Sequence, residues 1–246
     1  MDTLIQGGKY QVIEVLEAEE SYKACLCIDV ETKNDYRPMI FNIYEKHEDI
    51  RRFLPKFYSL DQEQHTDFIR VMSGQHSITA VFEYHLGIKL QNFFIQVDQE
   101  DFELRSKYAF LLLEACLMLD TIPDFIAYSC LEPGNIIVSE KSQKVMINYI
   151  IRPLEIGDEP FKWRKVAYLL EQIFVKNRFV PDEIWEYIDD LKQNEDEGIV
   201  GAFSRWKEIS EGLLAEHKRL KQEKLISYYI RRLKRSRQRM KRFFKK

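Results

Sequence analysis

The stretch Leu131-Glu-Pro-Gly-Asn-Ile-Ile-Val138 shows how the second half of the chain is organised. Its last four residues, 135–138, form a short strand-like run, and a second apolar run follows at 145–147 after a turn at 140–142. This pattern predicts a β-hairpin. Segments with helical spacing lie on both sides of it, so we expect the hairpin to be an isolated β element in a helical region.

The helical region begins near residue 90. Apolar residues recur there at helical spacing, which predicts long helices rather than strands. The expected helices cover residues 90–94, 104–119, 161–174, 182–191 and 202–214, and a further helix is expected in the C-terminal tail.

The region before residue 84 has a different pattern, with short apolar runs bounded by polar turns. We expect a helix at 48–60, which Pro55 would shorten or kink, and a turn at 31–35. The expected strands cover residues 10–16, 22–30, 38–44, 68–72 and 77–82. The sequence therefore predicts an α+β chain with a β-rich N-lobe (1–84), a helical C-lobe (85–215) and a tail (216–246).

Composition excludes several classes of protein. With 45% hydrophobic and 13% aromatic residues, the chain can bury a core, which argues against wholesale disorder. No apolar run reaches the roughly 18 residues that a membrane-spanning helix needs, and no secretory signal is visible at the N-terminus. The four cysteines form no CxxC pair and the five histidines are scattered, so we expect reduced thiols and no metal site.

Charge is distributed unevenly along the chain. Residues 218–246 hold 14 basic residues and one acidic residue, a net charge of +13. Residues 1–217 hold 23 basic and 39 acidic residues, a net charge of −16. An acidic body with a basic arm predicts an anionic partner for the arm.

Five phrases, in this order, resemble those of eukaryotic-type protein kinases over about residues 8–210. The stretch 131–138 is similar to the "LKPENILV" of the kinase catalytic loop, and residues 64–71 to the phrase "HPNIVRV". Residues 8–16 resemble the first kinase strand, 37–44 the strand that carries the VAIK lysine, and 82–90 the hinge. The resemblance implies a bilobal protein kinase-like fold.

The resemblance also implies where phosphoryl-transfer residues should lie, and the N-lobe lacks them. The phosphate loop matches residues 17–22, where three glutamates stand in place of glycines and would repel a triphosphate. The VAIK lysine matches Asn42, which carries no charge. The helix glutamate that pairs with that lysine matches Lys56. The activating ion pair is therefore missing.

The C-lobe positions have changed as well. Cys130 takes the place of the catalytic-loop aspartate, and a thiol cannot accept a hydroxyl proton as a carboxylate does. Asn135 matches the magnesium-binding asparagine and is the one retained residue of the set. Asn148 takes the place of the magnesium-binding aspartate of the DFG motif, with Tyr149 as the alternative if the alignment is one residue off. Residues 151–159 must then serve as the whole activation segment.

These losses predict a pseudokinase that is no enzyme and binds neither cofactor nor metal. Among such proteins, the architecture resembles bacterial membrane-associated pseudokinase domains, such as that of the type VII secretion membrane subunit. An alternative remains open, in which an atypical enzyme binds nucleotide through Asn135 and Lys56.

The tail is predicted to be an amphipathic helix with an apolar stripe that includes Ile226, Ile230, Leu233 and Phe244. Its candidate anion-binding residues are Arg231, Arg232, Lys234, Arg235, Arg237, Arg239, Lys241, Arg242, Lys245 and Lys246. Phenylalanines beside lysines at 242–246 are typical of a membrane interface. Two alternatives remain: the tail binds nucleic acid, or the acidic body holds it in cis.

We therefore expect a non-catalytic scaffold that binds a protein partner at the cytoplasmic face of the cell membrane. Its membrane partner would be an anionic lipid surface contacted by the tail. Nucleic acid is the alternative anionic partner.

Overall fold

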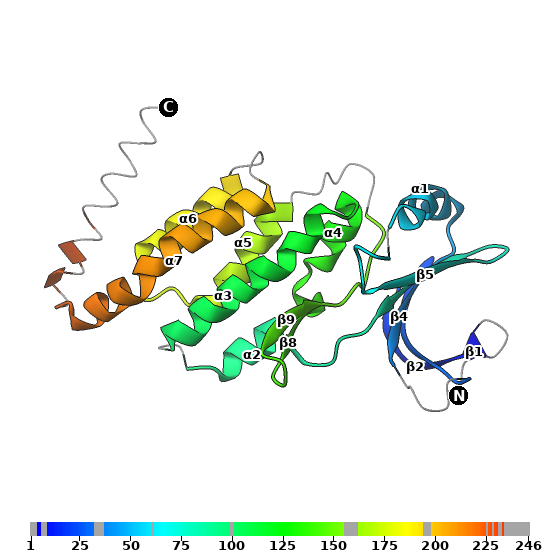
Figure 1. Ribbon diagram of the computed structural model, residues 1–246, viewed down its shortest axis with the longest axis horizontal. Helices are drawn as coiled ribbons and strands as arrows, with labels where there is room; N and C mark the ends of the chain where they lie inside the picture. The colour runs from blue at the N-terminus through cyan, green and yellow to red at the C-terminus, as the bar shows by residue number, and fades with distance from the viewer. Residues whose placement is uncertain are drawn as a thin grey trace.

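The structure is a computed structural model that describes residues 4–5, 9–31, 37–60, 62–98, 101–154, 162–193, 198–224, 226–227, 229–230 and 233. Within these residues the chain forms a β-rich lobe followed by a mainly helical lobe (Figure 1). This arrangement confirms the predicted bilobal α+β fold. The expected turn at 31–35 lies mostly outside the described residues.

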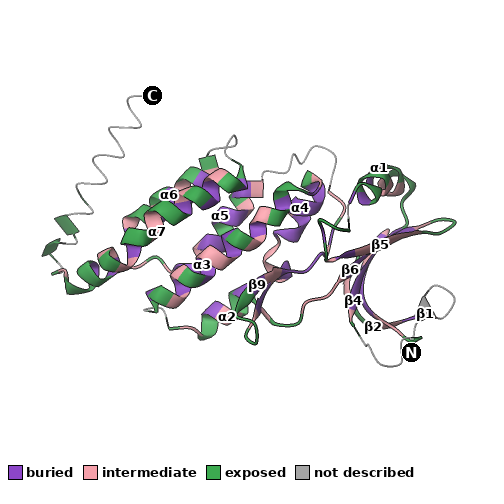
Figure 2. Ribbon diagram, viewed as in Figure 1, coloured by how far each residue is buried: buried purple, intermediate pink, exposed green. Residues whose placement is uncertain are grey.

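The N-lobe is built on a six-stranded antiparallel sheet in the order β1-β2-β3-β4-β6-β5. Its strands are β1 (Leu4–Ile5), β2 (Tyr10–Ala18), β3 (Tyr22–Asp29), β4 (Met39–Tyr44), β5 (Phe68–Ser73) and β6 (Ile78–Glu83). The five predicted strands are all present, and β1 is an addition. The inner strands β3, β4 and β6 are almost wholly buried because both of their faces are covered (Figure 2).

One helix, α1 (His47–Tyr58), packs on the sheet. Its buried residues, Phe53 and Phe57, lie four positions apart and therefore on one face. Pro55 does not shorten it, because α1 continues to Tyr58 and the carbonyl of Pro55 accepts a hydrogen bond from Ser59 N–H. The aromatic rings of Tyr44, Phe53, Phe57 and Phe82 then form a continuous cluster between helix and sheet.

The C-lobe is built around α3 (Phe102–Cys116), which contacts α5 (Lys162–Ile173) and α7 (Ile199–Gln222). The other helical elements are α2 (Leu90–Gln96), η1 (Leu117–Asp120), α4 (Asp124–Cys130), η2 (Pro133–Asn135) and α6 (Asp182–Gln193). Helix α4 was not expected from the sequence. One core cluster of buried side chains runs from the N-lobe through both lobes to α7.

The predicted hairpin is present in the C-lobe as β8 (Ile136–Ser139) and β9 (Lys144–Ile147), and β7 (Ile88–Lys89) pairs with β8. Gln143 takes a positive φ of 52° in the turn. The hairpin lies directly beside the junction of the two lobes (Figure 1). Residues 148–154 follow β9 and enter that junction, so the hairpin sets the position of the candidate site.

Helix α7 runs through the boundary expected at 215/216 and ends at Gln222. Beyond it, four described apolar side chains are exposed: Ile226 (73%), Tyr229 (54%), Ile230 (50%) and Leu233 (65%). All ten candidate anion-binding residues of the tail lie outside the described residues. Within the described part of the chain, we find no helix with the length and apolar character needed to cross a membrane.

Candidate functional site: the cleft between the lobes

Asn42 lies on the inner strand β4 and is fully buried. Its Oδ1 accepts hydrogen bonds from the Tyr22 hydroxyl (3.0 Å) and from Ile151 N–H (2.8 Å). Its Nδ2 donates to the carbonyl of Tyr149 (2.8 Å). The amide that stands where a kinase has its lysine is therefore fully engaged with the chain itself.

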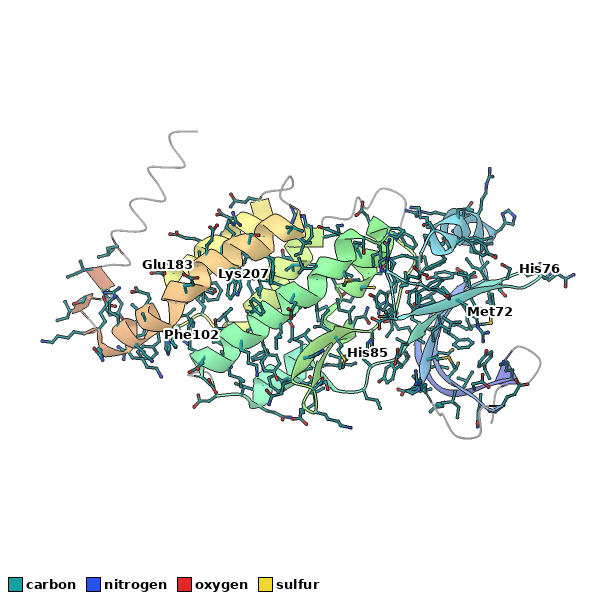
Figure 3. The ribbon with its side chains drawn as sticks, viewed as in Figure 1. Met72, His76, His85, Phe102, Glu183 and Lys207 are labelled. Carbon is teal, nitrogen blue, oxygen red and sulfur yellow. The ribbon has the colours of Figure 1, made fainter. Side chains whose placement is uncertain are left out.

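Asn148 follows β9 and is 3% exposed. Its Oδ1 accepts from His85 N–H at 2.8 Å, and its Nδ2 donates to the carbonyl of His85 at 3.2 Å. His85 belongs to the connector between the lobes and is labelled at their junction in Figure 3. One side-chain amide therefore satisfies both backbone polar groups of a connector residue.

Asn135, at the end of η2, is also buried. Its Nδ2 donates to the carbonyls of Ser129 (3.0 Å) and Ile150 (3.1 Å), and its own carbonyl accepts from Asn148 N–H (2.8 Å). Asn42, Asn135 and Asn148 thus lie around the same segment, residues 148–151. The tertiary structure brings these three predicted site residues together.

Cys130 is the last residue of α4 and is fully buried. Burial raises its pKa well above the ordinary value of a thiol, and the nearby charge of Asp67 adds to this effect. The side chain is therefore a neutral thiol at physiological pH. It behaves as a small apolar core residue.

Lys56 does not join the other four residues. It lies on the exposed side of α1, with its Nζ 4.9 Å from the centre of the Phe125 ring. Phe53, from the buried face of α1, stacks on Phe125 with ring centres 4.6 Å apart. Phe53 and Lys56 of α1 thus both contact the ring of Phe125, which belongs to helix α4 of the C-lobe.

An ion pair that was not expected from the sequence joins the two lobes near the surface. Arg152 donates from Nε and Nη2 to the two carboxylate oxygens of Glu17, each at 2.5 Å. Glu17 lies near the β2–β3 turn, where the phosphate loop was expected. The hydrogen bond and charge of Glu17 raise the pKa of Arg152. The available sequence signal was the negative charge of three glutamates at 17, 19 and 20, which favours a nearby cation.

Tyr149 fills the interior beside these groups. Its ring stacks on Phe82, with centres 4.8 Å apart and planes within 5° of parallel, and the residue is 7% exposed. Two hollows of the described surface, of about 290 and 500 Å³, lie elsewhere. The first lies between α3 and α7, and the second between the end of α1 and β5.

No protein-family model matches the chain, and no curated protein matches its sequence. Many solved structures are similar, among them a crystal structure of Rad53 1-466, a protein kinase, in complex with AMP-PNP. The TM-score is 0.57 at 14% sequence identity, covering 81% of this chain and 66% of the Rad53 chain. The match therefore spans just under two thirds of the Rad53 chain. At this identity the similarity shows the fold alone, and the chain has a protein kinase-like fold.

Proposed function

We propose that this chain is a non-catalytic pseudokinase that acts as a protein-binding scaffold. The observation that carries the proposal is the use of Asn42 and Asn148 within the cleft. Both are neutral amides at positions where the kinase reaction needs charge, and both are engaged with backbone groups of the chain.

Electrostatics support the same conclusion. A bound triphosphate needs cationic groups or magnesium around it, and magnesium needs carboxylate oxygens. Between the lobes, Asn42, Asn135 and Asn148 offer amides, Cys130 offers a neutral thiol, and the guanidinium of Arg152 is already paired with Glu17. Phosphoryl transfer therefore lacks its main source of transition-state stabilisation here.

The alternative, an atypical nucleotide-binding enzyme using Asn135 and Lys56, has less support. The Asn135 amide N–H groups already donate to two backbone carbonyls, so binding a ligand there would cost those hydrogen bonds. Lys56 is exposed and contacts Phe125. Its ammonium would have to leave this contact to reach a phosphate in the cleft.

A thermal shift series with ATP and magnesium tests the loss of nucleotide binding. A ligand with a micromolar Kd, present at millimolar concentration, stabilises the folded state by about 4 kcal/mol. We expect no upward shift in Tm with ATP·Mg²⁺ or ATP·Mn²⁺. A saturable shift would show that the cleft opens to admit nucleotide and would refute the proposal.

We also propose that the basic C-terminal segment holds the scaffold at the cytoplasmic face of a membrane, as the resemblance to bacterial membrane-associated pseudokinases implies. Residues 218–246 carry a net charge of +13. The apolar side chains of Ile226, Tyr229, Ile230 and Leu233 are at least half exposed, so they are available to enter a lipid interface. Each basic residue close to an anionic leaflet contributes about 1 kcal/mol.

Cosedimentation with neutral and anionic liposomes tests this second proposal. We expect the full chain to bind only anionic liposomes, with binding weakened by salt and lost in a version ending at Lys224. A matched variant, Ile226→Ser with Ile230→Ser and Leu233→Ser, keeps every charge and should bind more weakly. If the full chain ignores anionic liposomes but retains RNA or DNA, the nucleic-acid alternative replaces the membrane proposal.

A further inference from the structure

Residues 148–154, the segment that follows β9, lie between the two lobes and are called the strap here. We propose that the strap makes the two lobes a single cooperative folding unit, with the Glu17–Arg152 ion pair as its outer contact. The lobes then cannot open separately, and the surface offered to a partner has one fixed shape. The proposal depends on the contacts of the strap and not on the loss of catalysis.

The N-lobe holds the strap through side chains from two elements. From β4, Asn42 binds Tyr149 O and Ile151 N–H, and the Tyr44 hydroxyl donates to the carbonyl of Ile151 at 2.6 Å. From α1, Arg52 Nη1 donates to the carbonyl of Leu154 at 2.9 Å. Asn42 and Tyr44 are fully buried, so water does not compete for the bonds that these two side chains make.

The C-lobe holds the same residues from the other side. Asn135 Nδ2 donates to the carbonyl of Ile150, and the Ser129 hydroxyl donates to the carbonyl of Arg152 at 3.2 Å. Asn148 N–H donates to the carbonyl of Asn135 at 2.8 Å. Backbone groups of the strap thus alternate between partners in the two lobes: Tyr149 and Ile151 to the N-lobe, Ile150 and Arg152 to the C-lobe.

Separating the lobes would break all the bonds between the strap and one of the two lobes together. A buried donor or acceptor without a partner carries a desolvation penalty, so a partly opened state would hold several such groups at once. If the strap left the N-lobe, the stack of Tyr149 on Phe82 of β6 would also be lost. The free energy needed to separate the lobes therefore approaches the free energy of global unfolding. Under that condition partly opened states are not populated, and unfolding is two-state.

The chain contains natural probes for each lobe. Its three tryptophans, Trp163, Trp185 and Trp206, all lie in the C-lobe, so their fluorescence reports unfolding of that lobe. Cys25 and Cys27 are buried in β3 of the N-lobe, and Cys116 is buried in α3 of the C-lobe. Urea unfolding followed by pulsed thiol labelling, with mass spectrometry to identify each cysteine, therefore reports both lobes in one sample.

For the full-length protein, we expect Cys25, Cys27 and Cys116 to become reactive at the same urea concentration, coincident with the tryptophan transition. In the variant Asn42→Ala with Tyr44→Phe, Cys25 and Cys27 should react at a lower concentration than Cys116. Should this variant fail to fold, Tyr44→Phe alone, which removes one hydroxyl and keeps the ring, should show a smaller separation in the same direction.

Asn177→Ala is the matched control. The Asn177 side chain accepts hydrogen bonds from Phe179 N–H and Val180 N–H, within the C-lobe and away from the strap. Loss of this side chain should lower the urea concentration at the midpoint of unfolding. The cysteine and tryptophan transitions should remain coincident. Separate transitions in the unmodified chain, coincident transitions in the strap variants, or a separation in Asn177→Ala would each overturn the proposal.

Discussion

The cleft between the lobes and the C-terminal segment beyond α7 use their side chains in opposite ways. In the cleft, buried neutral amides satisfy nearby backbone groups. Beyond α7, a strongly basic sequence carries apolar side chains that are exposed wherever they are described. The amides between the lobes are engaged with the chain itself, whereas the described apolar side chains beyond α7 are exposed. In this chain, then, the residues that match the kinase catalytic positions, Asn42, Asn135 and Asn148, already have hydrogen-bond partners within the chain.

The largest expected effect on stability comes from Asn42. Asn42→Ala leaves the Tyr22 hydroxyl, Tyr149 O and Ile151 N–H without their partner, all in buried surroundings. At about 1–3 kcal/mol for each unpaired buried group, partly relieved by relaxation, we expect a loss of about 3–5 kcal/mol in the free energy of unfolding. Urea titration measured by tryptophan fluorescence gives this value.

A control for Asn42→Ala is Asn92→Ala, on the exposed face of α2. It should change the free energy of unfolding by less than about 0.5 kcal/mol. Equal effects of the two substitutions would mean that the buried amide of Asn42 contributes no more to the free energy of unfolding than an exposed amide does.

Asn148→Ala should have the next largest effect. It removes both hydrogen bonds to the His85 backbone, which lies closer to the surface than Asn42. Because water can reach these groups more easily, we expect a loss of about 2–3 kcal/mol. Amide exchange provides a second reading: His85 N–H should lose protection in the variant, while amides within α3 keep theirs.

The connector should also make stability depend on pH. His85 Nε2 lies 3.2 Å from Asp67 Oδ1. Burial alone would lower the pKa of His85, but the hydrogen bond to Asp67 and the charges of Asp67 and Glu83 outweigh burial and raise it. A raised pKa means that the charged form is stabilised in the folded state. This contribution is therefore complete below the unfolded pKa of about 6.5 and is lost as pH rises through the folded value.

As His85 loses its proton, we expect the free energy of unfolding to fall by up to about 1 kcal/mol between about pH 6 and pH 8. Asp67→Asn should abolish that part of the pH dependence. A variant with the pH profile of the unmodified chain would show that the pair contributes no pH dependence.

Removal of the C-terminal segment should have the smallest effect on stability. Its described apolar side chains are exposed, so a chain ending at Lys224 should unfold within about 0.5 kcal/mol of the full chain. If instead the acidic body holds the tail in cis, truncation should destabilise the chain measurably at low salt and much less at high salt. The same measurement thus distinguishes a tail that does not contribute to stability from a tail that the acidic body holds in cis.

Much of the fold was predictable because its signals are local. The five strands, α1 and the β8–β9 hairpin follow from hydrophobic spacing and turn residues, and their order along the chain indicates the bilobal architecture. Helix α4 was missed because its apolar residues 125–127 are consecutive and so show no helical spacing. Helix α7 was expected to end at 214 but continues to Gln222.

The positions of three site residues relative to one another were predictable from the sequence. The hydrogen-bond partners of those residues were not. The order of the motifs indicates which residues meet, and Asn42, Asn135 and Asn148 do meet. Lys56 was assigned by counting along a helix, and a helix places neighbouring positions on different faces. Lys56 follows Phe53 by three positions, so its side chain reaches the same Phe125 ring while the residue stays exposed.

The sequence alone determined that Asn42, Cys130 and Asn148 stand where kinases have charged residues, and that an excess of basic residues follows residue 217, because charge is a property of residue identity. Only the tertiary structure decided what replaces the missing charge. The partners of Asn42 are 20, 107 and 109 residues away along the chain, and those of Asn148 are 63 residues away. Nothing in the local sequence identifies a backbone carbonyl at that separation as a partner. The three-dimensional packing of β4 against the segment after β9 brings these groups within hydrogen-bonding distance.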